Sequence, residues 1–197
     1  QLVQSTLAPR VLGEDALGLK AAWQRMHRAV RNQGWTGLAS MAMAAVDNAL
    51  WDLKARLLDV PLVRLWDAAR EQVPVYGSGG FTNYSSVQLQ GQLAAWAEQG
   101  LRAVKMKIGR QPDRDPGRVA LARQAIGEGV DLMVDANGSL TRNAAQQLAL
   151  ELAAYQVSWF EEPLPASQRE EMRSLRRRLP AGMQLALGEY AWQDQDF

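Results

Sequence analysis

The spacing of apolar residues along the chain changes near residue 70. Before that point, apolar positions recur at helical intervals among charged residues, over Glu14–Arg31 and again over Leu38–Leu58. Pro61 is expected to end the second run, because proline cannot continue the backbone hydrogen-bond ladder. We therefore predict that the first seventy residues are mainly helical.

From Val73 onward, short apolar runs typical of strands alternate with helical patterns. The strand-like runs are Val73–Ser78, Ala103–Ile108, Asp131–Asp135, Val157–Phe160 and Gln184–Leu187. The helical patterns between them are Val87–Gln99, Pro116–Glu128, Arg142–Tyr155 and Gln168–Arg178. Successive strand-like runs begin 26 to 30 residues apart. This alternation predicts βα units on a parallel sheet.

The helix boundaries in this region carry recognisable end signals. Residues that commonly cap helix N-termini stand at the expected starts: Ser85 or Ser86, Asp115, Thr141 and Ser167. Gly100 follows the first of these helices, at the position where glycine often ends a helix.

Two α/β folds are built from such units, an open doubly wound sheet and a closed (β/α)8 barrel of the TIM type. The barrel is favoured, because polar residues gather at the carboxyl end of each strand. Only five units are present, so about three more are expected beyond Phe197.

Composition and charge exclude several classes of protein. The chain has 22 Lys and Arg against 21 Asp and Glu, so we expect neither nucleic acid nor an anionic membrane surface as a partner. There is no cysteine, which excludes disulfides and thiolate metal sites. No apolar run approaches the roughly 18 residues of a membrane-spanning helix, and no signal peptide is visible. We expect a cytoplasmic protein, of which this chain is a part.

Charged residues stand where three successive strands end. Asp135, Glu161 and Glu189 would each bring a carboxylate to the same rim of the barrel. Close carboxylates repel one another unless a cation lies between them, and an all-oxygen site suits Mg²⁺ better than a softer metal. On the preceding strand, Lys105 and Lys107 are two residues apart and therefore point to the same side.

Each of these residues also has an ordinary interpretation. A single Asp or Glu is most often a solvated loop residue or a helix cap, and an isolated Lys-x-Lys pair usually lies on the surface. The repetition of charges at successive strand ends favours a functional site.

The motifs VKMKIG, MVDANGSLT, WFEEPLP and LGE, in this order and spacing, resemble the enolase superfamily in its mandelate racemase/muconate lactonizing enzyme group. Upstream, Met43–Leu62 resembles the segment in which that family passes from its capping domain into its barrel. The resemblance implies that residues 1–70 are the C-terminal helical part of an α+β capping domain and that residues 71–197 are the first part of the barrel.

The resemblance also implies a chemistry for the charged residues. Asp135, Glu161 and Glu189 would bind Mg²⁺, and Lys107 would be the base that removes a proton α to a carboxylate. Lys105 would lie beside it, favour its neutral form by like-charge repulsion and pair with the substrate carboxylate.

Two further residues take supporting roles in this interpretation. Asn137 would lie near the metal and contact a substrate hydroxyl. Glu162 would contact the metal ligands without binding the metal itself. The only histidine, His27, is expected to be a surface or interhelical residue. The His–Asp pair of mandelate-racemase-like members would fall on later strands, and the loop that selects the substrate would precede Gln1.

The leading functional hypothesis is dehydration of an acid sugar, with a small carboxylate as substrate and a homo-oligomer as the assembly. Racemisation, epimerisation or cycloisomerisation is the first alternative. Epimerase relatives commonly have Asp as third metal ligand, so Glu189 argues against that variant. The other alternative is a non-catalytic scaffold or fragment, against which the retention of both lysines and all three carboxylates argues.

Overall fold

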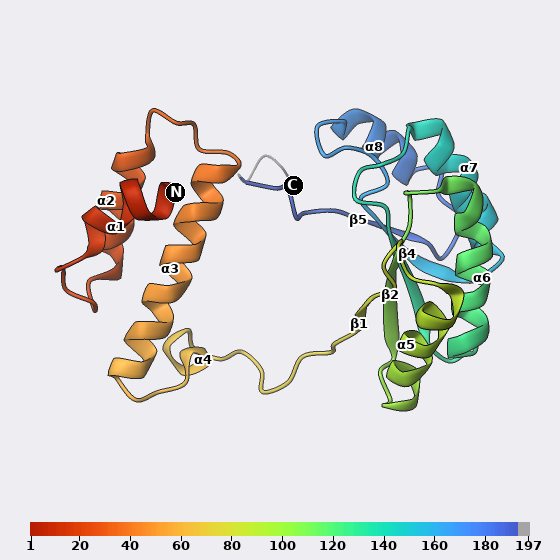
Figure 1. Cartoon of the computed structure of the whole chain (residues 1–197), viewed down its shortest axis with the longest axis horizontal. Coiled ribbons are helices and arrows are strands. Elements are labelled where there is room, and N and C mark those ends of the chain that lie inside the picture. Colours follow the sequence, from red (N-terminus) through yellow and green to blue (C-terminus); the bar gives the residue numbers. More distant parts are fainter. Residues whose placement is uncertain (193–197) are drawn as a thin grey trace. The chain divides into compact units, whose positions relative to one another are not determined.

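The computed structural model describes residues 1–192, and the chain divides into two compact units (Figure 1). The first unit comprises Gln1–Val73 together with the chain from Tyr190 on, and the second is Pro74–Glu189. The sequence-based boundary lies close by, between residues 70 and 71. The last five residues of the predicted barrel segment 71–197 lie outside the described residues.

The first unit is helical throughout its described elements. These are η1 (Val3–Leu7), α1 (Ala8–Val11), α2 (Leu19–Val30), α3 (Leu38–Leu57) and α4 (Leu62–Leu65). Met26 and Val30, one turn apart on α2, share a buried cluster with Met43 of α3, which joins the two long helices. The helix α2 begins later than Glu14, because the carboxylate of Asp15 accepts the backbone N–H of Leu17 and stabilises a turn there.

His27 lies within an aromatic group of the first unit. Its ring stacks on Trp23, with centroids 5.0 Å apart, and meets the edge of Trp35 at 4.5 Å. These contacts give His27, a residue of α2, a role in packing.

The second unit contains a five-stranded parallel sheet with the strands in sequence order. Its elements are β1 (Gly77–Gly79), α5 (Ser86–Glu98), β2 (Ala103–Lys107), η2 (Pro112–Arg114), α6 (Asp115–Ile126), β3 (Asp131–Asp135), α7 (Arg142–Ala153), β4 (Val157–Glu161), α8 (Arg169–Arg176) and β5 (Gln184–Ala186). Figure 1 shows α5, α6, α7 and α8 on one side of the sheet. A doubly wound sheet reverses its strand order and carries helices on both faces, whereas successive units of a barrel do neither. The arrangement therefore favours the barrel.

The alternation of side chains along each strand separates a core face from a polar face. Val104 and Met106 of β2 are fully buried in one cluster with Phe160 of β4 and with residues of all four covering helices. Lys105 and Lys107, at the intervening positions, therefore project from the opposite face, which becomes the interior of a closed barrel.

The first strand differs from its prediction. Val73–Ser78 was the expected strand, but the structure pairs only Gly77–Gly79, in register with β2. Trp96 of α5 packs so closely that a Cβ on Gly77 would stand 2.4 Å from its ring, and one on Gly79 would stand 2.8 Å from it. Because glycine has no Cβ, the chain can pair with β2 at Gly77–Gly79 while Trp96 of α5 packs against it.

Two of the four predicted helix caps are confirmed. The Ser85 hydroxyl accepts the N–H of Gln88 in a capping box, and the Thr141 hydroxyl accepts the N–H of Ala144. The prediction was wrong for Ser167, since Gln168 holds the cap position. It was also wrong for Asp115, which is the first residue of α6 and turns its carboxylate to a backbone N–H outside the helix.

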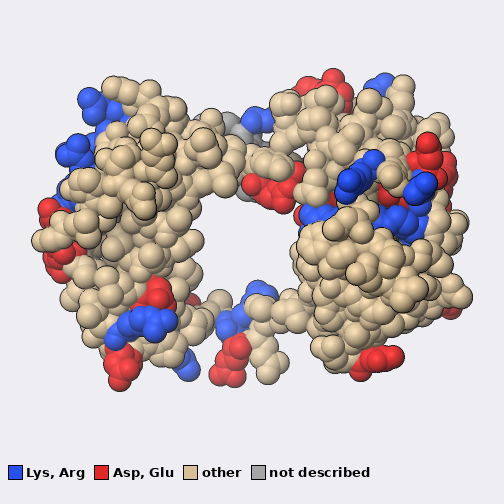
Figure 2. Space-filling model, viewed as in Figure 1, with Lys and Arg blue, Asp and Glu red and all other residues tan. Residues whose placement is uncertain are grey.

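Acidic and basic side chains are mixed over the visible face of each unit (Figure 2). This distribution agrees with the net charge of +1. None of the helices within residues 1–192 is long and apolar enough to cross a membrane.

The contact between β1 and Trp96 gives a first prediction. Gly77→Ala should lower the free energy of unfolding by about 1–3 kcal/mol, because its methyl group would overlap the indole ring. Urea unfolding of the full-length protein would measure the loss. Gly91→Ala is the control: it lies in α5 with open space around its Cβ and should instead gain about 0.5–1 kcal/mol. Equal stability of both variants would contradict the packing argument.

Candidate metal and proton-transfer site

The strand register brings charged residues of three strands into one row. Lys107 at the end of β2 pairs with Asp135 at the end of β3, which pairs in turn with Glu161 at the end of β4. Neighbouring strands are about 4.8 Å apart, so side chains in such a row come within contact distance. The carboxyl ends of the strands therefore form a charged rim.

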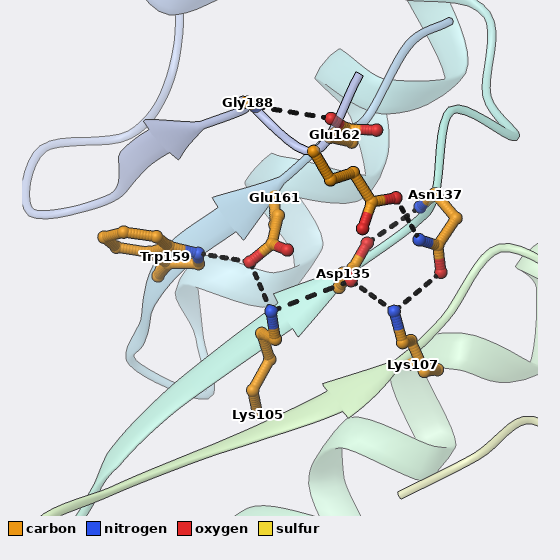
Figure 3. A network of polar contacts seen from close by, with 9 residues as sticks. Lys105, Lys107, Asp135, Asn137, Trp159, Glu161, Glu162 and Gly188 are labelled. Carbon is orange, nitrogen blue, oxygen red and sulfur yellow. Dashed lines mark hydrogen bonds and ion pairs between the residues drawn. The ribbon is translucent and has the colours of Figure 1, made fainter. Parts of the chain in front are cut away.

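Both lysines reach the same carboxylate (Figure 3). The Nζ of Lys107 donates to Oδ2 of Asp135 at 2.5 Å, and the Nζ of Lys105 lies 3.8 Å from that oxygen. Lys105 also donates to Oε2 of Glu161 at 2.6 Å. Two ammonium groups and two carboxylates thus meet on the polar face of the sheet.

The burial of these groups makes their pairing necessary. Asp135 is fully buried and Lys105 is only 7% exposed. Burial by itself lowers the pKa of Lys105, but the hydrogen bond and negative charge of Glu161, helped by Tyr76, outweigh it and leave the pKa raised. Lys105 is therefore held as a cation.

Asn137 connects this network to the end of the fifth βα unit. Its backbone N–H donates to Oδ1 of Asp135 at 2.9 Å, in a left-handed conformation (φ 45°) that asparagine tolerates. Its side chain accepts from Nζ of Lys107 and donates to Oε1 of Glu189, each at 2.9 Å. Glu189 joins the site through Asn137.

Glu162 lies behind the row with one oxygen unpaired. Its side chain is 1% exposed, Oε1 accepts the N–H of Gly188 at 3.4 Å, and Oε2 has no hydrogen-bond partner. Burial raises the pKa of Glu162, and the negative charges of Glu189, Asp135 and Glu161 raise it further. Three carboxylates are thus close enough to act on Glu162.

Two contacts at this site were not anticipated from the sequence. Trp159 donates its Nε1–H to Oε2 of Glu161 at 3.0 Å, and the ammonium of Lys105 lies 5.3 Å from the ring centroid of Tyr76. Trp159 stands two residues before Glu161 on the same strand, so the period-two rule could have identified it as a neighbour. No sequence signal indicates the contact of Tyr76.

The carboxylates fit a divalent cation by their chemistry. Within residues 1–192, no three Asp, Glu or His side chains converge in the geometry of a formed metal site. The two ammonium groups take up carboxylate oxygens of Asp135 and Glu161. The donor set is all oxygen and its negative charges repel one another, which suits a hard divalent cation. Such a cation would also offset the negative charge around Glu162, one of whose buried oxygens has no hydrogen-bond partner.

Comparison with protein families matches both parts of the chain. The model described as the mandelate racemase / muconate lactonizing enzyme N-terminal domain matches residues 1–66, and that described as enolase C-terminal domain-like matches residues 88–197.

Similar proteins are acid-sugar enzymes and their structural relatives. The 3,6-anhydro-alpha-L-galactonate cycloisomerase of Streptomyces coelicolor is 38% identical over 164 residues, 82% of this chain and 45% of that protein. A mandelate racemase/muconate lactonizing enzyme-like protein from Rubrobacter xylanophilus is 50% identical with a TM-score of 0.94, over 99% of this chain and 55% of its own. L-talarate dehydratase from Polaromonas sp. JS666, complexed with Mg and L-glucarate, is 34% identical with a TM-score of 0.79, over 93% and 51%. The chain spans about half the length of these relatives.

The environment of Glu162 gives a pH-dependent prediction. A raised pKa means that the folded chain holds its proton more tightly, so ionised Glu162 costs stability above its ordinary pKa of 4.5. Without added metal, Glu162→Gln should therefore be more stable than the natural chain by about 1–3 kcal/mol at pH 7, and by much less near pH 4. Urea unfolding in EDTA at the two pH values measures this.

Glu170→Gln is the control for that measurement, because Glu170 is exposed on α8 and should change stability by less than about 0.5 kcal/mol. A Glu162→Gln effect of the same size at both pH values would contradict the charge argument.

Proposed function

The chain belongs to the mandelate racemase/muconate lactonizing enzyme group of the enolase superfamily, and from this premise we propose that the complete protein is a Mg²⁺-dependent enzyme that removes a proton α to the carboxylate of an acid sugar. Membership confirms the family resemblance and the (β/α)8 interpretation of the fold. One observation carries the functional proposal: two lysines and the carboxylates of successive strand ends form a single network of hydrogen bonds and ion pairs.

The difficulty of the reaction explains why such a network is useful. An α-proton beside a carboxylate is weakly acidic, because its removal places a second negative charge on the same group. When bound by Asp135, Glu161 and Glu189, Mg²⁺ supplies positive charge that offsets the second negative charge. Water is partly excluded around Lys105 and Asp135, which strengthens electrostatic interactions there.

The two lysines divide the remaining work in this proposal. Lys107 has the more exposed side chain, 24% against 8% for Lys105, so its Nζ is the one accessible to substrate. It takes the α-proton, and the C–H electron pair stays on the substrate. Lys105 remains charged and donates to the substrate carboxylate.

Dehydration is the finer form of the proposal. Loss of the α-proton would be followed by cleavage of the adjacent C–O bond, with the hydroxyl leaving as water and the enol product becoming a keto acid. This step needs an acid for the departing hydroxyl, the role that the resemblance gives to a histidine on a later strand. Asn137, which contacts Lys107 and Glu189, is placed to bind a substrate hydroxyl. The L-talarate dehydratase relative supports this choice.

Cycloisomerisation is the second candidate, and the Streptomyces relative favours it. It begins with the same proton transfer but differs in the fate of the intermediate. The intact network argues against a non-catalytic scaffold. Assembly as a homo-oligomer stays a prediction, supported by the exposed apolar residues Leu38, Met41 and Leu57 of α3.

The metal assignment predicts Mg²⁺ binding by the full-length protein. Glu161→Gln should weaken the binding at least about tenfold, because an amide replaces an anionic ligand. Isothermal titration with MgCl₂ measures the dissociation constants. The exposed Glu170→Gln variant should bind as the natural protein does. Equal affinities in the two variants would contradict Glu161 as a ligand.

The base assignment predicts the behaviour of Lys107→Ala. It should lower kcat about 100- to 10,000-fold while Mg²⁺ binding is retained or strengthened, because all three proposed ligands remain and Oδ2 of Asp135 loses its ammonium partner. The full-length enzyme would be incubated with aldonic and aldaric acids in deuterated water, following keto product and deuterium at C2. The exposed Lys20→Ala variant is the control.

Two results would overturn parts of this assignment. Full activity of Lys107→Ala towards every substrate would exclude Lys107 as the base. Activity confined to dipeptides or muconate-like acids would exclude an acid-sugar substrate but keep the proton-abstraction chemistry.

A further inference from the structure

We propose that Arg118 and Asp115 of α6 are positioning residues that fix the carboxyl end of β2 and thereby aim the side chain of Lys107. This inference rests on the proposed function, since it takes Lys107 as the base. Neither residue belongs to the charged network of the rim: both act on the backbone.

Arg118 holds the ends of two strands together. Its Nη1 donates to the carbonyl oxygen of Lys107 at 3.0 Å. Its Nη2 donates to the carbonyls of Gly80 and Phe81, at 3.1 and 3.0 Å. The backbone N–H of Lys107 donates to the same Gly80 carbonyl at 3.2 Å. One planar guanidinium thus joins the chain after β1 to the last residue of β2.

Asp115 holds the backbone on the other side of the same turn. Its Oδ2 accepts the N–H of Gly109 at 2.6 Å, and its Oδ1 lies 3.8 Å from Nη1 of Arg118. Gly109 has φ +92°, and a Cβ there would stand 2.0 Å from Oγ of Ser139, so this turn has little room to shift. The Lys107 carbonyl and the Gly109 N–H, separated only by Ile108, are both fixed by α6.

Arg118 and Asp115 are both largely buried, so their charges lose contact with water. The Asp115 side chain is 1% exposed and that of Arg118 is 17% exposed. Burial lowers the pKa of Arg118, an effect that the charge of Asp115 partly offsets. A partly buried charge is tolerated when it is hydrogen-bonded, and here the three carbonyls at the rim accept hydrogen bonds from Arg118.

Fixing this backbone matters for proton transfer. The position of the Lys107 Cα sets the region that Nζ can reach, and a displacement of about 1 Å from the reactive geometry can cost about 100-fold in rate. Neither Arg118 nor Asp115 has a hydrogen bond or ion pair to a proposed metal ligand among the described residues, so their effect should fall on the proton-transfer step and leave Mg²⁺ affinity unchanged.

The same helix supplies a matched control. Arg123 of α6 also donates to backbone carbonyls, those of Tyr155 (2.9 Å), Gly127 (2.7 Å), Val130 (2.7 Å) and Gln156 (3.2 Å). Burial likewise lowers its pKa. Val130 and Gln156 directly precede β3 and β4, so Arg123 fastens the amino ends of the strands, away from the rim.

The test compares Arg118→Lys with Arg123→Lys in the full-length enzyme. Each change keeps the charge but replaces the guanidinium fork with a single ammonium, so both should lower Tm to a similar extent. Only Arg118→Lys should lower kcat for deuterium exchange at C2, by about 10- to 100-fold, with KM and the Mg²⁺ dissociation constant within about threefold. Equal changes of kcat in the two variants would overturn the proposal.

Asp115→Asn decides the question if Arg118→Lys does not fold. It keeps an oxygen acceptor for the Gly109 N–H and removes the charge beside Arg118, so it should lower kcat relative to the natural enzyme while Mg²⁺ affinity is unchanged. An unaltered kcat would overturn the proposal.

Lys107→Ala separates the two levels of inference. If that variant loses C2 exchange while both arginine variants behave alike, the positioning role alone fails. If that variant retains exchange, Lys107 is not the base. The proposed role of Lys107 and the positioning role of Arg118 and Asp115 would then both be wrong.

Discussion

A buried carboxylate must be neutralised where it lies, and the rim of the second unit is organised around this requirement. Asp135 is completely buried, and burying an unpaired charge costs several kcal/mol. Its carboxylate is paired with ammonium groups from β2 and accepts the backbone N–H of Asn137. Lys105, Lys107 and Asn137 are the partners that neutralise it. Glu161 and Glu189 extend the same network to the fourth and fifth βα units.

The fold provides this arrangement through parallel pairing. Because successive strands run in the same direction, each carboxyl end arrives at one edge, and residues far apart in sequence become neighbours. The alternate residues pack against α5–α8 in a continuous core, so the strands cannot shift by one residue without burying charges. The hydrophobic core thus determines which face holds the lysines. Arg118 and Asp115 then limit the freedom of the chain where β2 ends.

In the proposed function, the charged rim would also connect metal binding, proton transfer and substrate recognition. The carboxylate oxygens proposed to bind Mg²⁺ are the ones that pair with lysines, so metal binding and lysine contacts compete for the same atoms. If Glu161 bound the metal, a substrate carboxylate would offer Lys105 a new partner. In this proposal, the exchange of partners keeps the total charge of a partly buried site balanced, while Lys107 becomes available as the base.

The sequence by itself determined the βα organisation, the polar and apolar faces of the strands and the residues at the strand ends, because these follow from local periodicity and from the motifs. Ser85 and Thr141 could be identified as caps for the same reason, since a cap bonds within its own helix turn. Tertiary structure alone decided that β1 is limited to Gly77–Gly79, because the close approach of Trp96 depends on how α5 packs. It also decided that Asp115 bonds Gly109, that Arg118 bonds the Lys107 carbonyl and that Asn137 bonds Glu189. Such contacts depend on register and helix docking, which no local pattern in the sequence records.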